Sequence, residues 1–172
     1  MTSVTIDQLN HLDQEAFVRE AGWVFEHSPW VAERAWPRRP YLSIEDLHGK
    51  MTAEVEQASR DEQLALLRAH PDLGSRAGMS SSSTNEQAAA GLDKLTAEEF
   101  LSLVLLNKAY TEKFTFPFLF AVKGSDKSEV LKTLERRLES SPEEEFFEAL
   151  RQVFRIARFR LEAIIEDRPQ ET

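Results

Sequence analysis

Helix-start signals recur along this chain, and they constrain its fold more than any other feature. In a capping box, a Ser or Thr is followed three residues later by a Glu, and each side chain accepts a hydrogen bond from the other residue's backbone amide. The pattern occurs at Ser59 with Glu62, Ser83 with Glu86, Thr96 with Glu99 and Ser141 with Glu144. Apolar residues at helical spacing follow these starts, so the sequence predicts an all-α fold.

Proline positions and hydrophobic periodicity complete the predicted set of helices. About seven or eight are expected, covering roughly residues 13–27, 29–36, 43–58, 59–70, 83–90, 96–110, 125–140 and 141–167. A chain of 172 residues is long enough for one domain with a substantial core. We therefore expect a single-domain helical bundle over residues 1–172.

The stretch near residues 114–123 differs from the rest of the chain. It is an almost unbroken apolar and aromatic run around Pro117, and Gly124 ends it. Its composition favours a strand, but no other segment offers a partner strand. We therefore predict a buried extended segment that lines the interior, whose unpaired backbone amides are available to a ligand.

Charge and composition exclude several classes of protein. The formal net charge of −9 argues against a general nucleic-acid or anionic-membrane binder. There is no cysteine, and the four histidines have no close metal-ligand spacing, so neither thiolate chemistry nor a metal site is expected. No secretory signal, no apolar run of about 20 residues and no peroxisomal tail is recognisable. We expect a cytoplasmic protein without nucleic-acid or membrane partners.

The stretch from His70 to Leu92 holds the candidate chemistry. Pro71 disfavours helix at the preceding residue, so the helix should end at His70 and leave the imidazole free to point into a cleft. Glu86 follows in the first turn of the next predicted helix. The competing interpretation is structural, since Ser83 and Glu86 also fit an ordinary capping box.

Arg160 is the second candidate, on the last predicted helix. At 100° per residue it lies about 20° from Val153, inside the apolar arc. Arg151, Arg155 and Arg158 lie together on the opposite, solvated side. Because an unpaired buried guanidinium is costly, Arg160 should have either an acidic partner or an anionic ligand.

An ordered set of motifs resembles one known family over nearly the whole chain. The motifs are FEHSPW at residues 25–30, RP at 39–40, AHPDL at 69–73, EQAAAGL at 86–92, LNKAY at 106–110, KFTFPF at 113–118 and AVKG at 121–124. Together they are similar to the OHCU decarboxylases, the 2-oxo-4-hydroxy-4-carboxy-5-ureidoimidazoline decarboxylases of urate breakdown. One departure is the serine-rich loop between the His-Pro and Glu-Gln motifs, which is a few residues shorter than usual.

The resemblance implies decarboxylation of that ureidoimidazoline to (S)-allantoin and CO2. The conjugated substrate ring can take up the electron pair left on carbon, so no cofactor and no metal is expected. The resemblance assigns catalysis to His70 and Glu86. It assigns substrate binding to Pro71, Ser83, Gln87, Phe118, Leu119, Phe120, Ala121 and Arg160. A small-molecule substrate and a possible homodimer are the implied partners.

Two other functions remain open at this point. One is a non-enzymatic helical interaction module, in which the aromatic segment from Phe114 to Phe120 docks a partner. The other is a hydrolase or isomerase that acts on a related ureide in the same pocket.

Overall fold

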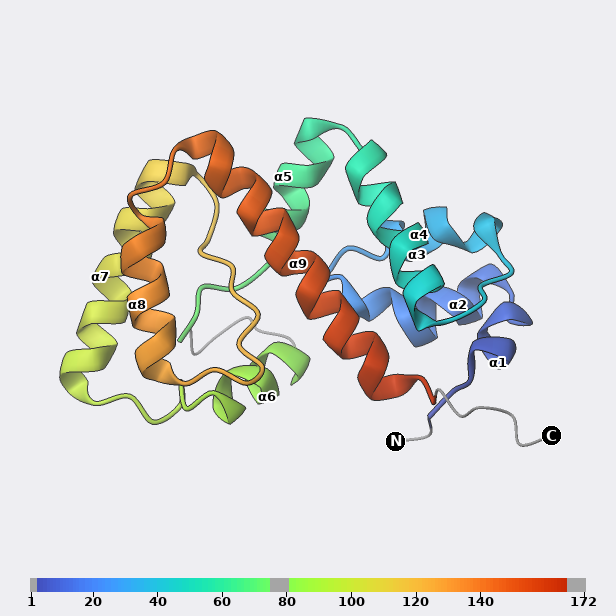
Figure 1. Cartoon of the computed structure of the whole chain (residues 1–172), viewed down its shortest axis with the longest axis horizontal. Helices are drawn as coiled ribbons and strands as arrows, with labels where there is room; N and C mark the ends of the chain where they lie inside the picture. Colours follow the sequence, from blue (N-terminus) through green and yellow to red (C-terminus); the bar gives the residue numbers. More distant parts are fainter. Residues whose placement is uncertain (1–2, 75–80, 167–172) are drawn as a thin grey trace. The chain divides into compact units, whose positions relative to one another are not determined.

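A computed structural model describes residues 3–74 and 81–166 of the chain. Within these ranges it holds nine α-helices and two 3₁₀ helices, and apart from one isolated bridge between Val4 and Ile165 it holds no β-structure (Figure 1). The α-helices are α1 Ile6–Asn10, α2 Gln14–Ala21, α3 Trp30–Ala35, α4 Ile44–Gln57, α5 Arg60–Arg68, α6 Ser81–Ala89, α7 Ala97–Phe114, α8 Lys127–Arg137 and α9 Pro142–Ile164. The predicted all-α fold is confirmed, and the short helix α1, which was not predicted, brings the number of α-helices in the described residues above the seven or eight expected.

Local capping sets most helix starts where the sequence predicts them. Thr96 and Glu99 form a complete capping box, with amide-to-side-chain distances of 2.9 and 3.1 Å. Ser59 and Glu62 do the same at 3.2 and 3.1 Å. The prediction for Ser83 is wrong, because α6 already includes Ser81 and therefore has Ser83 inside the helix. Four consecutive serines offer equivalent capping hydroxyls, so their spacing does not identify the first helical residue.

Other helix boundaries also differ from the prediction. The predicted helix over residues 13–27 ends at Ala21 and continues as the 3₁₀ helix Gly22–Val24, after which His27 has a positive φ of 47°. Helix α8 begins at Lys127, because Asp126 accepts a hydrogen bond from the Glu129 amide and so caps the helix. The last helix ends at Ile164 rather than near residue 167, and Ile165 instead forms the bridge with Val4.

The chain divides into two compact units, residues 1–66 with 154–172 and residues 67–153. The division falls within α5 and α9, so each of these helices contributes to both units. In the first unit, the His48 side chain of α4 contacts the Phe154 carbonyl of α9 through Nε2 at 2.7 Å. The single domain expected over residues 1–172 stays a prediction.

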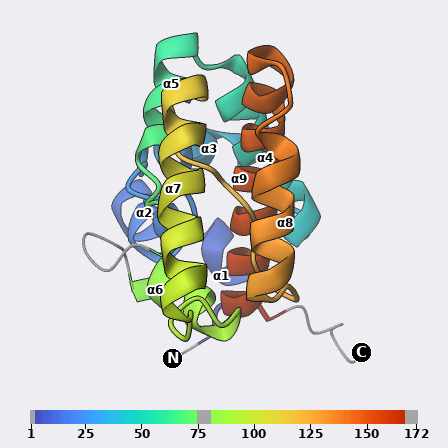
Figure 2. The same ribbon diagram turned by 90° about the vertical axis from the view of Figure 1, so that its left-hand side faces the viewer.

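The second unit is built around a crossover connection. Helices α7 and α8 lie side by side and run in the same direction, so the segment between them returns along their length (Figure 2). An 18-residue helix is about 27 Å long, and extended chain covers that distance in about eight residues. The segment from Thr115 to Ser125 is long enough to do this without secondary structure of its own.

Aromatic packing buries this connecting segment. The ring centroids of Phe114, Phe116 and Phe118 lie 4.6, 6.0 and 5.4 Å from that of Tyr110. All four side chains are buried. The predicted buried extended segment is therefore confirmed, and its burial removes the exposed aromatic surface that the interaction-module alternative required.

Candidate functional site

His70 lies two residues beyond the end of α5, in the segment that leads toward α6. The helix ends at Arg68 rather than at His70 as predicted, and the His70 amide donates to the Leu67 carbonyl at 3.3 Å. The His70 side chain is only 7% exposed, and Pro71 is half-buried. The imidazole is therefore a polar group held in the interior of the second unit.

Helix α6 contributes three of the predicted residues. Ser83 and Gln87 are buried and Glu86 is half-buried. The side-chain Oε1 of Gln87 accepts a hydrogen bond from the Gly74 amide at 2.8 Å. This bond ties α6 to the segment that follows the His70–Pro71 pair, so the structure brings these two motifs together.

Gly74 is required by the close approach of this segment to α7. Its φ is +78°, and a Cβ atom there would lie 2.5 Å from Cδ2 of Leu103. One residue earlier, the Leu73 carbonyl accepts a hydrogen bond from Nδ2 of Asn107 at 3.0 Å. The segment 72–74 is thus fixed on one side by α6 and on the other by α7.

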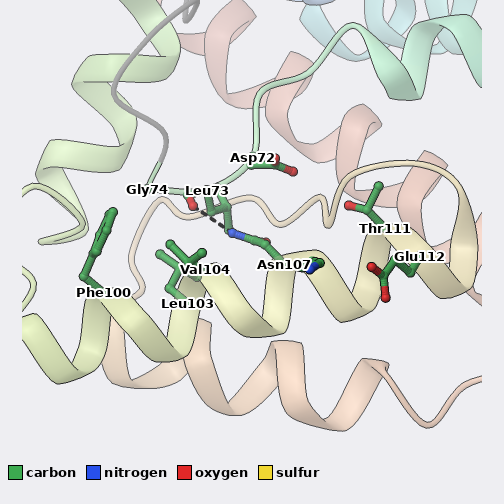
Figure 3. Close-up of a pocket in the computed structure, with 10 residues that line it drawn as sticks. Asp72, Leu73, Gly74, Phe100, Leu103, Val104, Asn107, Thr111 and Glu112 are labelled. Atoms are coloured by element: carbon green, nitrogen blue, oxygen red, sulfur yellow. Dashed lines mark hydrogen bonds between the residues drawn. The ribbon is translucent and has the colours of Figure 1, made fainter.

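A pocket of about 560 Å³ lies where this segment meets α7 (Figure 3). Leu73, Leu103 and Val104 supply apolar lining, and Asp72 and Lys108 add charged groups. The Asp72 side chain reaches the surface. Neighbouring protein atoms still remove part of the water around its carboxyl group, and this raises the pKa of that group. None of the described residues that line this pocket was predicted as a site residue.

The predicted binding residues 118–121 are held by side chains from two helices. Phe118, Leu119 and Ala121 are buried, and Phe120 is half-buried with its ring stacked on that of Phe118 at 6.1 Å. Nη1 of Arg137 donates to the Leu119 carbonyl at 2.5 Å. The Ala121 amide donates to Oε1 of Gln152 at 2.9 Å, so this amide, predicted to be available to a ligand, is already occupied.

Arg137 belongs to a buried polar cluster that the sequence analysis missed. Its Nε donates to Oε1 of Glu145 at 2.6 Å, and the same oxygen accepts the hydroxyl of Tyr110. Burial, together with the hydrogen bond to Glu145, raises the pKa of Tyr110. A signal was present, because Arg137 follows Val130 and Leu134 at helical spacing and so lies on the apolar stripe of α8.

Arg160 lies in the first unit, whereas the other predicted site residues lie in the second. It is 3% exposed, as its helical angle predicts, and its Nη1 lies 2.9 Å from Oε2 of the equally buried Glu26. The expected acidic partner is therefore present. Contact between Arg160 and an anionic ligand stays a prediction.

Neither a metal-binding cluster nor a membrane-spanning helix occurs in the described residues. No group of three or more acidic or histidine side chains there is arranged to hold a metal ion. No helix in the described part of the chain is both long and apolar enough to cross a membrane.

Comparison with known proteins gives consistent matches. The family model for OHCU decarboxylase matches residues 10–162. The 2-oxo-4-hydroxy-4-carboxy-5-ureidoimidazoline decarboxylase of Haloferax volcanii is 46% identical over 161 residues, which cover 94% of this chain and 96% of that protein. The uric acid degradation bifunctional protein PucL of Bacillus subtilis is also 46% identical, over 95% of this chain, but the chain spans only 33% of that protein.

A solved structure shares the fold. The crystal structure of (S)-allantoin synthase has a TM-score of 0.77 and 33% sequence identity to this chain. The match covers 95% of this chain and 54% of that one.

Proposed function

This chain belongs to the OHCU decarboxylase family, and from that premise we propose that it converts 2-oxo-4-hydroxy-4-carboxy-5-ureidoimidazoline to (S)-allantoin and CO2 in urate degradation. The observation that carries the proposal is the burial of His70, Ser83 and Gln87 in the second unit. Polar side chains are mostly exposed in folded proteins, so a group of buried ones marks a candidate site. His70 and Gln87 lie in two of the motifs that resemble the family, and the hydrogen bond from the Gly74 amide to Gln87 ties the segment after the first motif to the second.

The reaction breaks the bond between the ring carbon and its carboxylate. CO2 leaves, the electron pair stays on carbon and is shared with the conjugated ring, and one proton is then added to that carbon. The protein has to orient the substrate, stabilise the developing anion and supply the proton to one face. His70 suits proton transfer or polarisation of the substrate, because imidazole changes its charge near neutral pH.

Each of the remaining residues would bind a different part of the substrate. Glu86 would accept hydrogen bonds from the ureido and ring N–H groups, with Ser83 and Pro71 beside it. Because Oε1 of Gln87 already accepts from Gly74, its Nε2 is the group that would donate to the substrate. The amides of Phe118 and Phe120 would donate to substrate oxygens, and Arg160 would attract an anionic group.

In this proposal the enzyme needs no cofactor and acts in the cytoplasm as a homodimer. It has no nucleic-acid or membrane partners. The net charge of −9 supports the last point, since phosphate-rich surfaces would repel it.

The direct test uses substrate generated freshly from urate. We expect the protein to accelerate the formation of allantoin and to give the dextrorotatory (S)-enantiomer, followed by circular dichroism. Added chelator should leave the rate unchanged. Racemic allantoin at high protein concentration would contradict the decarboxylase function, and a rate lost to chelator and restored by a metal would contradict its cofactor-free form.

A further inference from the structure

We propose that Gln152, acting with Arg137, is a positioning residue that fixes the backbone of residues 118–121 so that the amides of Phe118 and Phe120 are presented to the substrate. The inference rests on the proposed function, because it assigns a task to groups of that same site. Neither Gln152 nor Arg137 lies in a motif that carries the family resemblance. Both became candidates only through their contacts with the connecting segment.

The first anchor is Arg137 of α8. Its guanidinium is a rigid fork, with Nη1 on the Leu119 carbonyl at 2.5 Å and Nε on Glu145 at 2.6 Å. The same guanidinium lies 4.6 Å from the centroid of the Phe118 ring. Arg137 is 4% exposed and Glu145 is 1% exposed, so water does not compete for these contacts. They fix the Leu119 carbonyl in one direction.

The second anchor is Gln152 of α9, which is 5% exposed. Its Oε1 accepts from the Ala121 amide at 2.9 Å, and its Nε2 donates to Oε1 of Glu148 at 2.9 Å. Glu148 lies one helical turn earlier and so orients the amide of Gln152. This orientation presents an acceptor, rather than a donor, to the connecting segment.

The two anchors hold the same edge of the segment. In extended chain, the N–H and C=O of one residue point to the same side, and the side alternates from residue to residue. The Leu119 carbonyl and the Ala121 amide therefore share an edge, and the amides of Phe118 and Phe120 point to the opposite one. Within the part of the chain that the structure describes, those two amides have no hydrogen-bond acceptor.

This arrangement replaces what a neighbouring strand would do in a sheet. A lone extended segment has no ladder to fix it, so side chains from α8 and α9 supply the hydrogen bonds along one edge. The free edge then offers two fixed donors, which need no reorganisation when charge develops on a substrate oxygen. Loss of the hydrogen-bond acceptor at position 152 is therefore expected to lower turnover, although Gln152 does not contact the reacting atoms itself.

The test compares three variants with the wild-type protein. Gln152→Met keeps the volume and removes the acceptor from the Ala121 amide. The double variant Gln152→Glu with Glu148→Gln exchanges the two groups, so that the residue at 148 donates to a carboxylate at 152 and the acceptor is restored. Val130→Ala is the control, because it removes buried volume from α8 of the same unit but no hydrogen-bonding group.

We expect Gln152→Met to lower kcat by about 10- to 100-fold, as misplaced catalytic groups do, with a much smaller change in KM. The double variant should recover most of that loss. Val130→Ala should lower the melting temperature and leave kcat near the wild-type value. A kcat for Gln152→Met that matches the control, or a loss that the double variant does not recover, would overturn the inference while the proposed function stands. Racemic product from the wild-type protein would overturn both.

Discussion

At the scale of single residues, Glu86 is where the two interpretations of the sequence separate. The capping-box interpretation required Ser83 at the start of a helix, and the structure has Ser83 inside α6 instead. Glu86 is therefore not the third residue of a helix capped by Ser83, and a substrate role for its half-buried carboxylate stays a prediction.

We predict that Glu86→Gln lowers turnover strongly while it changes the free energy of unfolding by no more than about 0.5 kcal/mol, as is usual away from caps and cores. The substitution keeps the size of the side chain and removes only the negative charge. Steady-state kinetics and thermal denaturation of the same preparation measure the two effects. A loss of about 1 kcal/mol of stability with full activity would assign Glu86 to capping after all.

Arg160 gives a second prediction at this scale, and it depends on the buried ion pair with Glu26. Because Glu26 is buried against Arg160, the single substitution Arg160→Leu leaves a carboxylate without its cation and should cost about 3–5 kcal/mol. The double substitution Arg160→Leu with Glu26→Leu should recover most of this loss, because it removes both charges.

Chemical denaturation of the two single variants and the double variant measures the coupling. Arg155→Leu is the control, since Arg155 is exposed on the same helix. If the stability-recovered double variant still binds (S)-allantoin like the wild type, Arg160 has no part in substrate binding. If binding is lost in the double variant, the ion pair belongs to the site.

At the scale of elements, the end of α7 stores conformational strain. Thr115 caps this helix in the left-handed conformation, with φ of 70° and ψ of 11°, and its amide donates to the Thr111 carbonyl. A β-branched residue is poorly suited to this region, whereas glycine adopts it readily. Nε of Arg68 donates a hydrogen bond to the Thr115 carbonyl at 3.0 Å. Because the acceptor is a backbone group, this bond does not require the Thr115 side chain.

We therefore predict that Thr115→Gly raises the free energy of unfolding by about 0.5–1 kcal/mol, the relief of strain less the entropy that glycine loses on folding. Thr111→Gly, within the helix and equally exposed, should instead lower it by about 0.3–0.5 kcal/mol, the difference in helix propensity between glycine and threonine. Urea denaturation of both variants checks the pair. A Thr115→Gly protein less stable than the wild type would show that the hydroxyl, rather than the backbone, holds this turn.

At the scale of the whole molecule, His48 makes stability depend on pH. Burial lowers the pKa of His48 below its ordinary value of 6.5, and the nearby charge of Arg158 adds to this. The hydrogen bond to the Phe154 carbonyl and the charge of Glu162 oppose the shift. Between the lowered pKa and 6.5, the unfolded chain binds more protons than the folded one. The free energy of unfolding must then fall as the pH falls through this window.

Replacement by glutamine should remove that dependence, because the amide can still donate to the Phe154 carbonyl but does not titrate. We expect the difference in stability between wild type and His48→Gln to shift in favour of the variant as the pH falls from above 6.5 to below the lowered pKa. Denaturant titrations across this range measure it. A difference that stays constant with pH would mean that His48 titrates alike in the folded and unfolded chain.

Local sequence determined much of this protein. The predicted helix starts at Ser59 and Thr96 are confirmed, because the hydrogen bonds of a capping box form within one helical turn and need no other part of the chain. The predicted burial of Arg160 is confirmed, because the angle of a residue around a helix depends only on its spacing along the sequence. The predicted extended segment is also confirmed, because an apolar run without a partner strand has few other ways to be buried.

Tertiary structure decided how those pieces are held and used. Nothing local pairs Arg160 with Glu26, or directs Arg137 and Gln152 to the backbone of residues 118–121, since these contacts join segments far apart in the sequence. The start of α6 was also beyond local signals, because equivalent serines leave the choice of the first helical residue to longer-range packing. Hydrogen bonds within a turn can be inferred from spacing, whereas a buried charge or a lone extended segment takes whichever partner the fold brings to it.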